Sequence, residues 1–134
     1  MVTVPVNRVP SGWRILDIGP ATVEAFSEAV GRPVVVLNDA DAAGLAEVRF
    51  GAGKGVTGVV LMLTLGTGIG SALLLDGQLV PNTELGHLTL HGADAEKYAA
   101  DSVREAHDLS WEDWGGRVGE YLRLVEGLLV PDLF

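Results

Sequence analysis

Two short segments of the sequence place carboxylates beside groups that could help them act on a polar substrate. Asn38 and Asp39 follow directly after the apolar run VVVL, and Glu84 lies three residues before His87 in the segment ELGH. A carboxylate held at the end of a rigid strand can accept a proton as a general base. A carboxylate next to an imidazole can hold sugar hydroxyls or a metal ion, although one Glu and one His fall short of the ligands that a zinc site needs.

Each of these side chains also has an ordinary structural explanation. Asn38 or Asp39 could cap the N-terminus of a helix that follows. Glu84 and His87 could form a plain pair on the surface. Glu96 would stand just inside a helix N-terminus, where a negative charge is favourable without any further role.

A glycine-rich segment, LTLGTGIG, could bring the backbone close to a phosphate. It contains Gly66, Gly68 and Gly70, with Thr64 and Thr67 among them. Glycines permit close approach, and successive N–H groups can cradle an anion. The dinucleotide fingerprint requires a helix after the glycines, whereas here the apolar run SALLL and an Asp-Gly pair indicate a second strand. The segment is therefore a strand–turn–strand unit, either a plain β-turn or a turn whose threonines face a phosphate.

The N-terminal half is expected to combine helices with a buried strand. Residues 20–30 show helical spacing of apolar residues and are followed by a glycine, a common C-terminal cap. Residues 32–37, RPVVVL, are apolar on both faces, which is typical of a central parallel strand. Residues 40–50 favour a helix in which Asp41 faces solvent. Residues 2–6 contain a proline and suggest an edge strand or an extended arm.

The C-terminal half is expected to hold a hairpin and then two helices. The runs VVLMLTL and SALLL are the predicted strands, and the Asp-Gly pair after them signals a tight turn. The next segment, PNTELGHLTLHG, is predicted to be a loop with a short strand. One helix is expected to run from a cap at Asp94 to about His107. A second should begin at a capping box formed by Ser110 and Asp113.

The composition excludes several classes of protein. The 134 residues include 18 acidic and 9 basic side chains, for a formal charge of −9. That balance argues against general binding to nucleic acid or to an anionic membrane surface. Cysteine is absent, so neither a disulfide framework nor a thiolate metal site is expected. No apolar run reaches the about 18 residues of a membrane helix, and we expect a cytoplasmic protein.

Taken together, these segments resemble the ROK family (repressors, open reading frames and kinases). The resemblance rests on the order of PVVVLNDADAAGLAE, GAGKG, LTLGTGIGSALLLDGQL, ELGH and AEKYAADS, and it extends over most of the chain. Within the family, the sequence is most similar to the polyphosphate glucokinases. The resemblance implies an α/β, actin-like or ribonuclease-H-like fold. On that fold, residues 1–53 would end the small domain and residues 54–134 would begin the large one.

The resemblance also implies a role for each candidate residue. Asp39 would be the general base that takes a proton from the sugar 6-hydroxyl. The implied sugar ligands are Asn38, Glu84, His87 and Glu96. The implied phosphate turn comprises Thr64, Gly66, Thr67 and Gly68. Phosphate would come from polyphosphate or ATP together with Mg²⁺, and the acceptor would be glucose or a related hexose.

The sequence departs from the family pattern in three places. The cysteine-rich zinc motif, the N-terminal Asp-x-Gly-Gly-Thr motif and a later Gly-Gly-Gly segment are all missing. We therefore expect no structural zinc, and we expect the 134-residue chain, as the central part of a longer enzyme, to be inactive alone. Family members are commonly dimers, so a homodimer is expected. Two alternatives stay open: a sugar-sensing regulator without catalysis, and an inactive fragment that acts only in assembly.

Overall fold

The computed structural model describes residues 20–134, so the predicted edge strand at residues 2–6 lies outside the described part. The chain forms two compact units, with the division between Asp39 and Ala40. The described part of the first unit contains helix α1, Pro20–Val30, which ends at Gly31 with a φ of +63°. Both the predicted helix and its left-handed glycine cap are confirmed.

The predicted central strand at residues 32–37 is wrong. The residues between α1 and the next helix are irregular, and Val35 is 57% exposed. The N–H group of Val34 donates to the hydroxyl of Ser27 at 3.1 Å, and that hydroxyl donates in turn to the carbonyl of Val23. Because the N–H of Val34 is bound to a helix side chain, it cannot donate to a neighbouring strand. An apolar pattern was therefore not sufficient to make this segment a strand.

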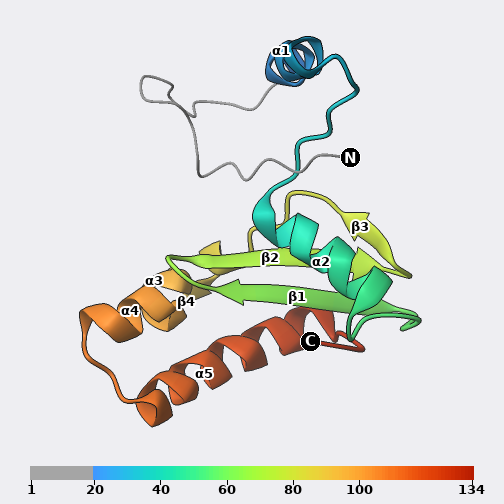
Figure 1. Ribbon diagram of the computed structural model, residues 1–134. Helices are drawn as coiled ribbons and strands as arrows, with labels where there is room; N and C mark the ends of the chain where they lie inside the picture. Colours follow the sequence, from blue (N-terminus) through green and yellow to red (C-terminus); the bar gives the residue numbers. More distant parts are fainter. Residues whose placement is uncertain (1–19) are drawn as a thin grey trace. The chain divides into compact units, whose positions relative to one another are not determined.

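The second unit is built on a three-stranded antiparallel sheet in the order β1–β2–β3 (Figure 1). The strands are β1 (Val59–Leu65), β2 (Ile69–Leu75) and β3 (Gln78–Val80). Between β2 and β3, Asp76 and Gly77 have φ values of 50° and 76°, as a tight Asp-Gly hairpin requires. The predicted strand–turn–strand unit and the second hairpin are both confirmed. On its other side, β1 has a parallel bridge from Val60 to Leu133.

A helix covers each face of this sheet (Figure 1). Side chains alternate along β1, so that Leu61 joins the core beneath α5 (Trp111–Leu129) while Val60 joins the core beneath α2 (Asp39–Phe50). The α5 core includes Tyr121 and Val125, which lie one turn apart on the same face of that helix. The second unit is therefore a helix–sheet–helix sandwich. None of the helices in residues 20–134 combines the length and apolar character that a membrane span requires.

Helix α2 lies unusually close to the sheet at Gly44. A Cβ atom built on Gly44 would lie 2.6 Å from the Cβ of Ala72 and 3.2 Å from a methyl group of Leu74. Normal carbon–carbon contacts are about 3.5–4.0 Å. The missing side chain thus permits the backbone of α2 to approach β2.

The single helix predicted from Asp94 to His107 is two short helices, α3 (Glu96–Ala99) and α4 (Asp101–Ala106). The chain is extended at Ala100, where ψ is 154°. The carbonyl of Ala99 accepts a hydrogen bond from the indole N–H of Trp114 at 3.0 Å. This tertiary contact and the burial of Ala100 hold the break, although neither residue disfavours a helix by itself.

Asp94 does not cap the first of these helices. It ends β5 (Ala93–Asp94), which pairs with β4 (Thr89–Leu90), and its carboxylate forms an ion pair of 2.9 Å with Lys97. That pair lowers the pKa of Asp94 and raises the pKa of Lys97. Ser110 caps α5 as predicted, because its hydroxyl accepts the N–H of Asp113. The Asp113 carboxylate accepts from that hydroxyl and not from the Ser110 N–H, so the reciprocal half of the capping box does not form.

Candidate functional site

Hydrogen bonds to its carbonyl groups hold the glycine turn between β1 and β2. The Gly68 carbonyl accepts the Gly66 N–H at 3.0 Å, which closes the turn. The Gly66 carbonyl accepts the backbone N–H of Ser102 at 3.1 Å, and the Thr67 carbonyl accepts the Ser102 hydroxyl at 2.7 Å. All three turn carbonyls are therefore bound within the protein.

Packing explains two of the three turn glycines. A Cβ atom at Gly68 would lie 2.5 Å from a carboxylate oxygen of Glu96, and one at Gly70 would collide with the hydroxyl of Thr64. Gly66 differs, because nothing lies within 4 Å of a Cβ built there. Its φ also lies outside the left-handed region. Neither contacts within the described part of the chain nor backbone strain therefore accounts for glycine at position 66.

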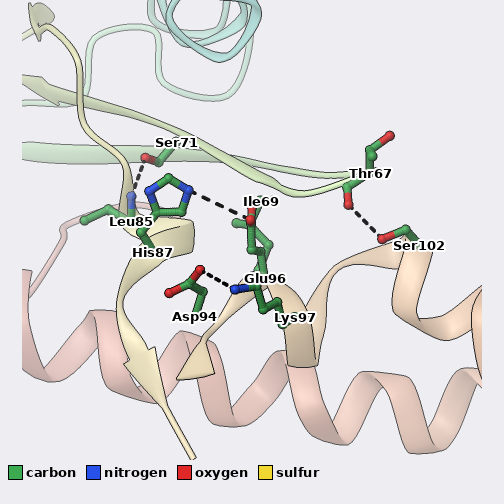
Figure 2. A network of polar contacts seen from close by, with 9 residues as sticks. All are labelled: Thr67, Ile69, Ser71, Leu85, His87, Asp94, Glu96, Lys97 and Ser102. Atoms are coloured by element: carbon green, nitrogen blue, oxygen red, sulfur yellow. Dashed lines mark hydrogen bonds and ion pairs between the residues drawn. The ribbon is translucent and has the colours of Figure 1, made fainter. Parts of the chain in front are cut away.

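Glu96 connects the glycine turn to His87 (Figure 2). One carboxylate oxygen of Glu96 lies 3.8 Å from Nε2 of His87, and the other accepts the N–H of Ile69 at 3.4 Å. The side chain of His87 is 60% exposed, whereas that of Glu96 is 29% exposed. The Glu96 carboxylate is thus a hydrogen-bond acceptor next to the glycine turn, with an exposed imidazole beside it.

The segment that carries Glu84 is fastened to β2 by Ser71 (Figure 2). The buried Ser71 hydroxyl donates to the Thr83 carbonyl at 2.8 Å and accepts the N–H of Leu85 at 3.1 Å. The two residues that flank Glu84 are therefore both fixed. Glu84 itself is exposed, and its side chain forms no ion pair with His87, which pairs with Glu96 among the described residues.

His87 follows Glu84 around one short turn. That turn is the 3₁₀ helix η1, Leu85–His87, in which the N–H of His87 donates to the Glu84 carbonyl at 3.2 Å. Gly86 at its centre lies against the backbone carbonyl of Ile69, so a side chain there would strike β2. Glu84 and His87 therefore share a turn and not the face of an α-helix.

Asn38 and Asp39 lie at the beginning of α2, which starts at Asp39. They end the first compact unit, and whether Asp39 faces the glycine turn stays a prediction. The next residue, Ala40, belongs to the second unit and is buried there. A Cβ atom built on Gly70 would lie 3.1 Å from the Cβ of Ala40. The chain therefore passes close to the first residues of β2 directly after Asp39.

The expectation that Asp41 faces solvent is wrong. Asp41 is only 2% exposed, and burial raises the pKa of its carboxyl group. A backbone hydrogen bond with Asn82 acts in the opposite direction. Asp41 is buried because it lies in the first turn of α2, on the face toward the sheet. The amino-acid composition contains no information about that position.

Some of the predicted site residues therefore lie close together, while the role of each residue and the position of Asp39 stay predictions. The structure brings Glu96, His87 and the glycine turn together, and it adds Ser71 and Ser102, which sequence reasoning missed. No signal in the sequence distinguishes these two serines from others, because their contacts join distant segments. In residues 20–134, no group of three or more His, Asp or Glu side chains converges as a metal site would require.

Comparison with known proteins identifies the family. The model of the ROK family matches residues 11–105. The polyphosphate glucokinase of Mycobacterium tuberculosis is 52% identical over 108 residues, which are 81% of this chain and 41% of that protein. The corresponding protein of Mycobacterium leprae is 49% identical over 108 residues, again 81% of this chain but 33% of that protein. The chain spans less than half the length of these relatives.

Solved structures agree with this assignment. The inorganic polyphosphate/ATP-glucomannokinase from Arthrobacter sp. strain KM matches 84% of this chain and 44% of its own, with 54% identity and a TM-score of 0.78. The ROK hexokinase from Thermus thermophilus matches 81% of this chain and 51% of its own, with 28% identity and a TM-score of 0.61. The chain has part of the actin-like, ribonuclease-H-like fold of these sugar kinases, and it belongs to the ROK family.

Proposed function

We propose that the whole protein transfers a phosphoryl group to the 6-hydroxyl of glucose or a related hexose. The donor would be polyphosphate, ATP or both. The observation that carries the proposal is the position of Glu96, whose carboxylate lies between the His87 imidazole and the backbone of the glycine turn. One side chain thereby links a group suited to sugar hydroxyls with a turn suited to phosphate. The names of the M. tuberculosis and Arthrobacter relatives support the same reaction.

The sugar would be held by hydrogen bonds from the carboxylates and the imidazole. Carboxylate oxygens accept from hydroxyl groups, and a neutral imidazole can donate with one nitrogen and accept with the other. Asn38, Glu84, His87 and Glu96 are the proposed ligands. Such a site rejects analogues that lack a hydroxyl, because an acceptor covered by the bound sugar would then be left without a partner. A ROK glucokinase from Streptomyces griseus, solved with glucose and AMPPNP, is 34% identical over 60% of this chain and 30% of its own, with a TM-score of 0.53.

Asp39 is the proposed general base. Its carboxylate would accept the proton of the 6-hydroxyl as the new bond to phosphorus forms, and general-base catalysis contributes about 10²–10⁴-fold. Chain continuity supports this role, since Asp39 directly precedes Ala40, which lies beside Gly70 at the beginning of β2. Phosphoryl transfer requires mainly positioning and charge stabilisation from the protein. The proposed mechanism therefore needs only one side chain that accepts a proton.

The phosphate donor is proposed to meet the turn formed by Thr64, Gly66, Thr67 and Gly68. The open space at Gly66 leaves room for a ligand close to the backbone. Mg²⁺ would enter with the donor and be held by its phosphates and by water, because the described residues supply no cluster of metal ligands. The formal charge of −9 also means that an anionic donor needs local help from backbone N–H groups.

A sugar-sensing regulator is the second candidate. A ROK family transcriptional regulator is 26% identical over 65% of this chain, which is 26% of its own length, and has a TM-score of 0.56. The residues proposed to hold the sugar would suit either role. The two functions differ in turnover: a regulator would bind glucose without transferring phosphate. The homodimer, and the inactivity of the 134-residue chain alone, likewise remain proposals.

The decisive experiment is Asp39→Asn in the full-length protein, assayed for glucose phosphorylation with polyphosphate and with ATP. Asp108→Asn is the matched control, because Asp108 is exposed and its left-handed φ of 48° also suits Asn. We expect turnover to fall by about 10²–10⁴-fold in Asp39→Asn while glucose binding, measured by calorimetry, persists. Turnover within about tenfold of the parent would exclude Asp39 as the base. Glucose binding without turnover in the parent would favour the regulator.

A further inference from the structure

Ser102 contacts the glycine turn twice, although it lies in a different element. It is the second residue of α4, and its backbone N–H has no acceptor inside that short helix. That N–H donates to the Gly66 carbonyl at 3.1 Å. The hydroxyl donates to the Thr67 carbonyl at 2.7 Å, as Figure 2 shows. One residue therefore binds two successive carbonyl groups of the turn.

These two bonds orient two peptide planes. In a trans peptide, the carbonyl of one residue and the N–H of the next point in opposite directions. With the Gly66 and Thr67 carbonyls directed toward Ser102, the N–H groups of Thr67 and Gly68 must point away from α4. Adjacent N–H groups held in one direction are the arrangement that binds a phosphate oxygen.

We propose that Ser102 is a positioning residue for the phosphate donor, holding the N–H groups of Thr67 and Gly68 toward the transferring phosphate. The inference rests on the proposed kinase function and deepens it. Ser102 would not touch the substrates. Its backbone bond to Gly66 is available to any residue at position 102, whereas the bond to the Thr67 carbonyl requires a hydroxyl. The Thr67–Gly68 plane is consequently the one that depends on this side chain.

The test compares Ser102→Ala with Ser102→Thr in the full-length protein. Thr keeps the hydroxyl, so it should retain the parent's kinetics within about threefold, whereas Ala should lose the orientation of the Gly68 N–H. Removing one aimed donor from an anion-stabilising site lowers turnover about 10²–10³-fold. Because the Gly68 N–H is misdirected rather than removed, we expect kcat/KM for the donor to fall by at least about tenfold in Ser102→Ala, with the KM for glucose within about twofold.

Ser110→Ala is the matched control, because it also removes a hydroxyl from a helix N-terminus. Ser110 caps α5, and its hydroxyl forms hydrogen bonds only with Asp113 among the described residues. Its loss should lower stability and leave both KM values unchanged. A donor-specific effect in Ser102→Ala, absent from Ser110→Ala, therefore cannot come from reduced stability.

A structural readout separates this inference from the proposed function. The Gly66 N–H closes the turn on the Gly68 carbonyl, so its hydrogen exchange should accelerate by about tenfold in Ser102→Ala if the hydroxyl holds the turn. Unchanged exchange would overturn the positioning role whether or not the protein is a kinase. An equal rise in the KM values for donor and glucose would also overturn it. If the parent shows no kinase activity while Gly66 exchange accelerates as expected, the proposed function is wrong. The Ser102 hydroxyl would then still be shown to hold the glycine turn.

Discussion

Replacing Gly44 by Ala tests how closely α2 approaches the sheet. In an exposed helix interior, Gly→Ala stabilises by about 1 kcal/mol, because Ala has the higher helix propensity. At Gly44 the added methyl group would lie 2.6 Å from the Cβ of Ala72 and 3.2 Å from a methyl group of Leu74. The propensity gain and the steric cost therefore act in opposite directions at this position.

The distances decide which effect dominates. Restoring a normal contact of about 3.5–4.0 Å requires the helix and the strand to separate by about 1 Å. Overpacking of a well-filled core costs about 1–3 kcal/mol, and the Ala72 contact is rigid because a Cβ atom cannot rotate away. After the propensity gain of about 1 kcal/mol is subtracted, we expect a net loss of stability of up to about 2 kcal/mol.

The assay is urea unfolding of the variant and of Gly116→Ala, followed by far-ultraviolet circular dichroism. Gly116 lies in α5 and nothing is within 4 Å of a Cβ built there, so this control should be stabilised by up to about 1 kcal/mol. The two substitutions are chemically identical and should have opposite signs. Equal stabilisation of both proteins would show that α2 does not approach β2 as closely as described.

Three further substitutions probe the turn, the core and a helix end. Gly66→Ala should leave the free energy of unfolding within about 0.5 kcal/mol of the parent, because no atom lies within 4 Å of the new Cβ. It should nevertheless lower the rate of phosphorylation by about tenfold or more. Normal turnover would show that the donor does not bind next to Gly66. Tyr121→Phe should stabilise by about 1 kcal/mol at neutral pH, since the buried hydroxyl has no hydrogen-bond partner in the described part of the chain. Burial raises the pKa of Tyr121 from 10.0 to about 12, so the unfolded chain loses this proton first. Stability of the parent should therefore fall by up to about 1.4 kcal/mol per pH unit between these values, and urea titrations should show a shallower fall in Tyr121→Phe. Val130→Gly should raise the thermal midpoint, because Val130 is 75% exposed and has a left-handed φ of 45° that costs a β-branched residue about 1–3 kcal/mol; an unchanged or lower midpoint would contradict that strain.

Local patterns were sufficient for the hairpin and for the long helix. The run VVLMLTL coincides with β1, and the Asp-Gly pair adopts the left-handed turn that it predicts. Ser110 caps α5 as its spacing with Asp113 indicates. These features depend on neighbours within a few residues, and a single sequence contains that information.

The failures share a cause, which is dependence on distant residues. The apolar run RPVVVL resembles a strand, but the Ser27 hydroxyl takes the N–H of Val34. The helix break at Ala100 depends on Trp114, which binds the Ala99 carbonyl from 15 residues further along the chain. Asp41 is buried because of where α2 lies on the sheet. Composition and periodicity contain no information about these contacts.

The candidate site likewise contains residues that the sequence predicted and residues that it did not. The residues named from the family resemblance include Glu96 and His87, which the structure brings within 3.8 Å of one another. Ser71 and Ser102, which fix the two segments from behind, were not identified. A hydroxyl that binds backbone groups can be provided by any serine, so its importance becomes visible only when the partner is known.

The parallel bridge between Val60 and Leu133 has a consequence for the order of folding. The β1–β2 hairpin closes over a few residues. In contrast, the N–H of Leu61 donates to the carbonyl of Leu133, which follows α5 in the sequence. Pairing that must wait for a long loop to close is slow, because the entropy of closure is lost before any contact compensates for it. We expect the hairpin edge to gain protection from exchange early in refolding, and β1 to acquire its second neighbour only after α5 has docked.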